Sequence, residues 1–260
     1  MNIKFSYFNK ITLLIVISVI ATASLLFVPA IPQDPTYHQF ADQRTLLGIP
    51  HCLNVVSNLL FLIVGGLGTK LLVSDNNQNI LKEVYPAYLL FFTGIFATGM
   101  GSSYYHLSPS NQTLIWDRLP MTIAFMAFFT IILSEFVSVK AGKQIFLPSL
   151  IFGIFSVWYW DYTEQLGRGD LRLYGLVQFL PILLIFLFLT LFSSRLTYSR
   201  YYWYLLGFYL LAKIFEVADH PIYEWVTFIS GHSIKHLLAA LGCYFIYVQL
   251  KQRRVGDKQE

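Results

Sequence analysis

Polar and charged residues divide this chain into eight predominantly apolar stretches, each close to 20 residues long. An α-helix needs about 20 apolar residues to cross the roughly 30 Å hydrocarbon core of a bilayer. We therefore expect an all-α polytopic membrane protein whose helices are joined by short loops. The expected spans are 11–31, 53–73, 85–105, 118–138, 144–160, 173–193, 201–218 and 233–250.

The first apolar stretch is separated from the others by a loop that contains proline and aspartate. Its apolar region is longer than that of a typical signal peptide, which has about 7–15 residues. We interpret residues 1–31 as an uncleaved signal-anchor helix, with a cleaved signal peptide as the alternative. The prediction is thus a seven-transmembrane-helix bundle at 53–250 plus one extra N-terminal transmembrane helix. An outer loop at 32–52 and a cytoplasmic tail at 251–260 complete the expected organisation.

Composition supports a membrane location and excludes two other classes. Of the 260 residues, 56% are hydrophobic and only 12% are charged, whereas soluble domains carry about 25% charged residues. The net charge of +4 is spread over the loops, so we expect no nucleic-acid partner. Cys52 and Cys243 are too few for a disulfide framework. The sequence indicates no particular oligomeric state.

The distribution of cations predicts the orientation in the membrane. Segments on one side hold twelve of the eighteen Lys and Arg residues, and segments on the other side hold four. Because cations are enriched in cytoplasmic loops, both termini are expected in the cytoplasm. All six histidines then fall on the outer side of the membrane, where we expect the active site to lie: His38, His51, His106, His220, His232 and His236.

Two short segments carry candidate chemistry. His232 and His236 are four residues apart, so a helix places both imidazoles on one face. Two such nitrogens supply half of a tetrahedral zinc site, and His106 is the best candidate for a third ligand. A haem or copper site, or a solvated helix face, fits the pair as well. His38 and His51 remain unassigned loop residues.

Other polar residues lie close to these histidines in the sequence. Ser102 lies one turn before His106, and either packs between helices or lines the site. Asp117 stands at the expected start of a helix, so capping that helix is its alternative role. Lys213 and Glu216 are three apart and are expected to pair. Lys235 lies between the two histidines of the pair, in an interfacial ion pair or beside the site.

The order and spacing of Ser102, His106, Asp117, His232 and His236 resemble the alkaline ceramidases, together with the segment 54–58 (NVVSN). That family belongs to a superfamily of seven-helix membrane hydrolases that includes the progestin/adipoQ receptors. The resemblance extends over about residues 42–250. It implies zinc held by the three histidines, with Ser102 and Asp117 as catalytic residues close to the zinc-bound water. The implied activity is hydrolysis of a ceramide-like N-acyl membrane lipid to a fatty acid and an amino base.

The chain departs from this pattern at its N-terminal side. Eukaryotic members resemble one another in an acidic loop that binds calcium, whereas this chain offers only Asp34 and Asp42, with His51 where an acid is expected. The sequence therefore gives weak support for a calcium ion. A seven-helix lipid receptor or binding protein with a structural zinc is the alternative function. An intramembrane Ser/His protease ranks last, because Ser102 is not followed by glycine.

Overall fold

The computed structural model describes residues 6–74 and 80–253. Within these ranges, seven helical segments are long and apolar enough to cross a membrane. The helices are, in chain order, α1 (Tyr7–Ser24), η1 (Pro35–His38), α2 (Cys52–Val56), α3 (Leu59–Ser74), η2 (Lys82–Val84), α4 (Tyr85–Leu107), α5 (Asn111–Phe136), α6 (Val139–Gln165), α7 (Arg172–Leu191), α8 (Arg200–Val217), α9 (Asp219–Val226) and α10 (Gly231–Gln252).

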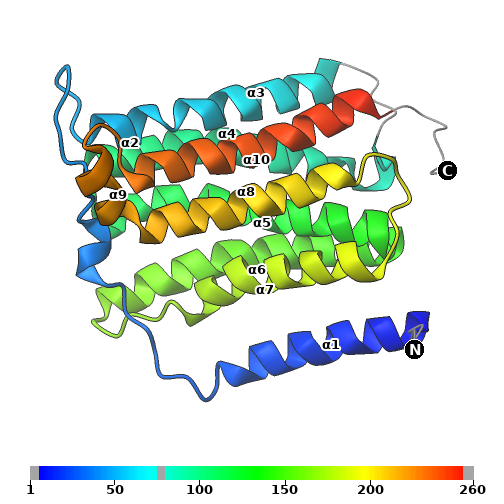
Figure 1. Cartoon of the computed structure of the whole chain (residues 1–260). Coiled ribbons are helices and arrows are strands. Elements are labelled where there is room, and N and C mark those ends of the chain that lie inside the picture. Colours follow the sequence, from blue (N-terminus) through cyan, green and yellow to red (C-terminus); the bar gives the residue numbers. More distant parts are fainter. Residues whose placement is uncertain (1–5, 75–79, 254–260) are drawn as a thin grey trace.

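The long helices lie side by side in one bundle, and α1 stands apart from it along α7 (Figure 1). The helix α8 also lies within the bundle, but it is not among these seven segments and carries the charged residues Arg200, Lys213 and Glu216. The expected all-α bundle of seven helices with one extra N-terminal helix is confirmed. The orientation of this bundle in the membrane stays a prediction, and most of the expected tail at 251–260 lies outside the described residues.

The extra helix is attached to α7 at both of its ends. Lys10 donates a hydrogen bond to the carbonyl of Leu191. At the other end, Arg172 donates to the carbonyl oxygens of Leu25 at 2.9 Å and Val28 at 2.6 Å. The helix α1 ends at Ser24 rather than at residue 31, because prolines at 29 and 32 disfavour helical geometry before them. Among the described residues, α1 packs mainly against α7.

The start of α5 differs from the sequence prediction in a way that matters for Asp117. Ser110 is the N-cap: its hydroxyl oxygen accepts a hydrogen bond from the Thr113 amide at 3.2 Å, and its own amide donates to Thr113 Oγ1 at 3.1 Å. This reciprocal capping box begins the helix at Asn111 rather than at 118. Asp117 therefore lies in the second turn of α5. The alternative interpretation of Asp117 as a helix cap was wrong.

A buried ion pair joins helices at the end of the bundle where α5 and α10 terminate. Arg253 donates to both oxygens of Glu135, at 2.7 Å each, and Glu135 is 0% exposed. Tyr88 donates a hydrogen bond to the same carboxylate, and Arg253 also donates to Tyr202 Oη at 3.0 Å. Four elements, α4, α5, α8 and the end of α10, are thereby connected. The start of α10, which carries His232 and His236, lies at the opposite end of the bundle, beside α2 and α9 (Figure 1).

Candidate metal centre and active site

Three buried histidines converge from two helices. His106 lies in the last turn of α4, and His232 and His236 lie in the first two turns of α10. One nitrogen from each ring lies within 4.8 Å of the others, a grouping that could hold a metal ion. The Nε2 atoms of His106 and His232 are 3.3 Å apart. Two ligands at about 2.0–2.1 Å from a tetrahedral zinc ion are roughly this far apart, so the spacing of this pair fits such an ion.

A break between α2 and α3 orients the His236 ring. Ser57 lies in this break, where its hydroxyl donates to the Asn54 carbonyl at 3.0 Å and contacts His236 Nδ1 at 2.8 Å. Because the Ser57 hydroxyl proton is donated to the Asn54 carbonyl, the N–H at His236 Nδ1 donates to Ser57 Oγ. This tautomer leaves the Nε2 lone pair of His236 free for a ligand.

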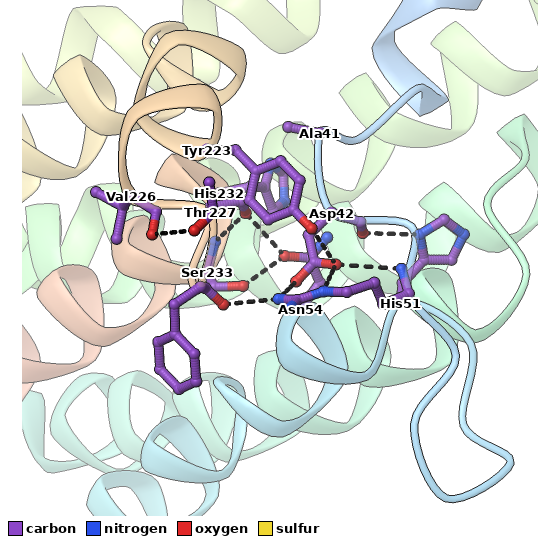
Figure 2. Close-up of polar contacts among 12 residues, drawn as sticks. Ala41, Asp42, His51, Asn54, Tyr223, Val226, Thr227, His232 and Ser233 are labelled. Atoms are coloured by element: carbon purple, nitrogen blue, oxygen red, sulfur yellow. Dashed lines mark hydrogen bonds and ion pairs between the residues drawn. The ribbon is translucent and has the colours of Figure 1, made fainter.

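The first turn of α10 is held by side chains from two other elements, α9 and α2 (Figure 2). Asp219, at the start of α9, accepts hydrogen bonds from the amide of His232 at 2.7 Å and from the amide of Ala41 at 2.9 Å. Ser233 donates to Asn54 Oδ1 at 2.7 Å. These buried contacts fix the backbone that presents the two histidines of α10.

The loop before α2 covers the histidines. The ring of Phe40, which is 3% exposed, lies 4.6 Å from the His106 ring and 4.4 Å from the His232 ring, centroid to centroid. Arg44 anchors this loop, since it donates to both oxygens of Asp42 and to the Phe228 carbonyl. Phe40 therefore separates the histidines from the loop side of the bundle.

The electrostatics of this loop strengthen its attachment. Burial alone would raise the pKa of the Asp42 carboxyl, but hydrogen bonds from Arg44 and the charge of its guanidinium lower that pKa below its usual value. Asp42 is thus held as a carboxylate, and its oxygens are already engaged by Arg44. Asp34 accepts a hydrogen bond from the Thr36 amide at 2.8 Å and caps η1. Both acids of the expected outer loop have local structural roles.

Ser102 and Asp117 are brought together where α4 and α5 approach most closely. A Cβ atom at Gly101 would lie 1.8 Å from the Trp116 carbonyl oxygen, so only glycine permits this contact. This approach brings Ser102 on α4 and Asp117 on α5 to the wall of the same cavity. Together with His236 they line one cavity, so the structure gathers all five sequence-predicted site residues in one region.

Two cavities meet at Asp117. The narrower one, about 150 Å³, lies inside the bundle and has mostly apolar walls that include Phe91 and Phe128. The wider one, about 660 Å³, opens beside α1 and α7, with Leu25 and Phe179 in its walls. The residues common to both cavities are Asp117, Met121, Gln178, Lys213, Glu216 and Lys235.

The expected pairing of Lys213 with Glu216 is confirmed. Lys235 joins the same carboxylate from α10, with its Nζ 2.7 Å from Glu216 Oε1. The structure therefore places Lys235 beside the site, in an ion pair that the sequence left undecided. His38 lies outside the metal grouping, because its ring nitrogens contact Tyr105 Oη at 2.8 Å and Asn111 Oδ1 at 2.9 Å.

Sequence reasoning missed several residues that shape this site. Phe40 gave no signal, because an aromatic residue in a loop is common. Asp219 and Ser57 were detectable only as polar residues near or inside apolar spans, which are costly there and are often functional. Their partners lie far away in the sequence, so no local pattern identifies them.

Comparison with known protein families agrees with this geometry. Residues 48–260 match the family described as Ceramidase. The matched region begins at the loop before α2 and includes all three histidines, Ser102 and Asp117, while α1 lies outside it. No curated protein matches the chain.

Proposed function

We propose that this chain, which belongs to the ceramidase family, hydrolyses ceramide-like N-acyl lipids in a zinc-dependent reaction centred on His106, His232 and His236. Membership of the family implies a membrane hydrolase that acts on amides. Zinc dependence and the roles of individual residues are our proposal. The observation that carries the proposal is the buried histidine grouping beside Ser102 and Asp117, at the junction of two cavities.

The donor set suits zinc. Three imidazoles with no carboxylate among them match catalytic zinc sites, which keep a fourth position open. Ser57 holds His236 in the tautomer that a ligand requires. When bound, zinc supplies a Lewis acid that polarises a carbonyl group and makes water more acidic.

Asp117 and Ser102 supply the remaining chemistry. Asp117 accepts the proton of the attacking water and delivers it to the nitrogen of the departing amine, as a general base and then a general acid. Ser102 donates a hydrogen bond to the carbonyl oxygen as negative charge develops on it. Both side chains face the same cavity as His236, so one bound amide can reach all three.

The cavities suit a lipid with two chains. The narrow apolar cavity takes the acyl chain, and the wider cavity beside α1 takes the amine half, which places the amide near Asp117. Phe40 closes the loop side of the histidines, so we propose that the lipid reaches the site laterally from the bilayer. A receptor with a structural zinc would bind such a lipid without releasing fatty acid.

Replacing any one of His106, His232 and His236 with alanine is expected to remove zinc, because two imidazoles leave the ion open to water and chelators. The measurement is zinc content per purified protein, together with fatty-acid release from an N-acyl lipid in detergent micelles. His38→Ala is the control, since the ring nitrogens of His38 contact Tyr105 and Asn111 rather than the other histidines. Zinc loss in His38→Ala with retention in His106→Ala would refute the ligand assignment.

Ser102→Ala is expected to retain zinc and to lower the rate of hydrolysis by about 10²–10³-fold, the effect of losing one oxyanion donor. Ser103→Ala is the matched control, because the Ser103 hydroxyl donates to the Gly99 carbonyl at 2.7 Å on another face of α4. The two variants are compared by kcat on the same lipid. Equal kcat values for both variants and the unmodified protein would exclude Ser102 from the reaction.

A further inference from the structure

We propose that the amine half of the substrate carries an anionic group, which binds to Lys213 and Lys235 beside Asp117. This inference rests on the proposed hydrolase function and specifies its substrate class. It begins from a cluster of charged residues in a mostly apolar region of the bundle. Glu216 pairs with Lys213 on α8 through Oε2 and with Lys235 on α10 through Oε1. One carboxylate thus faces two ammonium groups.

Both ammonium groups have N–H donors without an acceptor among the described residues. Each ammonium carries three N–H donors, and within the described residues each has a single acceptor, a Glu216 oxygen. Lys213 and Lys235 line both cavities, with side chains 33% and 16% exposed. Unpaired charged donors in mostly apolar surroundings are costly. A ligand that brings several acceptor oxygens to this point removes that cost.

The charges of the residues that line the wide cavity also favour an anionic ligand. Four cations line it, Arg118, Arg172, Lys213 and Lys235, against the two carboxylates Asp117 and Glu216. Arg172 is neutralised by Asp170, whose Oδ2 lies 2.7 Å from Arg172 Nη2. Asp170 itself does not line the cavity. The remaining cations outnumber the carboxylates, and a metal ion at the histidines would add further positive charge.

Arg118 differs from the two lysines in its surroundings. It is 5% exposed, and its guanidinium lies 4.2 Å from the Trp160 ring and 4.6 Å from the Tyr174 ring. Its Nη2 donates to Gln33, and its Nη1 has no hydrogen-bond partner in the described part of the chain. No carboxylate in the described ranges forms a salt bridge with it. An anionic ligand in the wide cavity would supply the missing negative charge.

The position of the cluster identifies which half of the lipid carries the anion. Lys213, Lys235 and Asp117 stand where the cavities meet, so a group bound there lies next to the amide. The narrow cavity is otherwise lined mainly by apolar side chains, which suits the hydrocarbon of the acyl chain. The anionic group therefore belongs to the head group of the amine half, with its own chain extending toward α1.

The test compares three lipids that share one acyl chain and differ in the head group of the amine half: an uncharged hydroxyl, a sulfonate and a quaternary ammonium. We expect the sulfonate lipid to have the highest kcat/KM. The specificity ratio is kcat/KM for the sulfonate lipid divided by kcat/KM for the hydroxyl lipid. Lys213→Gln is expected to lower this ratio by about tenfold, the effect of losing one charge-assisted hydrogen bond. Lys213→Arg, which keeps the charge, is expected to retain most of that ratio.

The exposed Lys140, at the start of α6, gives the control variant Lys140→Gln, in which the ratio should equal that of the unmodified protein. Hydrolysis of all three lipids at similar kcat/KM, with no effect of Lys213→Gln on the ratio, would overturn this inference and leave the hydrolase function standing. A second result would also overturn the inference: added fatty acid inhibits the protein, Lys213→Gln relieves this inhibition, and the ratio is unchanged. The cluster would then bind the carboxylate of the released fatty acid. Hydrolysis of none of the lipids would overturn the proposed function itself.

Discussion

Asp117→Asn is expected to lower the rate of amide hydrolysis by about 10²–10⁴-fold while zinc remains bound. The amide side chain has nearly the same shape and volume as the carboxylate. It cannot take up the proton of the attacking water, so the general acid–base contribution is lost. The start of α5 is unaffected, because Ser110 and Thr113 form the cap of that helix.

Zinc content and single-turnover hydrolysis on the same preparations test this expectation. Asp161→Asn is the control, since Asp161 accepts a hydrogen bond from Gln165, at 2.8 Å, near the end of α6. Near-normal turnover in Asp117→Asn would end the assignment of Asp117 as a general base. Loss of zinc from this variant would instead make Asp117 a metal ligand.

Arg253→Gln is expected to lower the free energy of unfolding by about 3–5 kcal/mol, because it leaves the Glu135 carboxylate buried without its counter-charge. Glu135 is 0% exposed, and Arg253 supplies two of the hydrogen bonds to its oxygens. The pair lies at the end of the bundle away from the histidines, so the folded fraction should keep its zinc and its kcat.

Denaturant unfolding in detergent, followed by helical circular dichroism, measures this loss. The double variant Glu135→Gln/Arg253→Gln removes both charges and should recover part of the stability, since neutral amides can pair with each other. Lys251→Gln, at an exposed position two residues earlier, is the control. Equal stability of Arg253→Gln and Lys251→Gln would show that the buried pair contributes little.

The sequence alone was sufficient for the architecture and for one half of the site. The length of the apolar stretches determines a membrane-spanning helix, because each must cover a fixed hydrocarbon thickness. The four-residue spacing of His232 and His236 determines that both rings share a helix face, as does that of Ser102 and His106. The three-residue spacing of Lys213 and Glu216 likewise predicted their ion pair, which the structure contains. These are local properties, set by the repeat of the helix itself.

Tertiary structure decided which of these faces meet. Ser57 contacts His236 across 179 positions of sequence, and Arg253 reaches Glu135 across 118. Such contacts depend on how helices cross and on where side chains permit close approach, as Gly101 does between α4 and α5. The placement of Phe40 over the histidines likewise follows from a loop anchored by Arg44 to a carbonyl 184 residues away. Helical periodicity fixes the direction of a side chain on its own helix but carries no information on the partner helix, so packing alone brought Asp117 to the histidines.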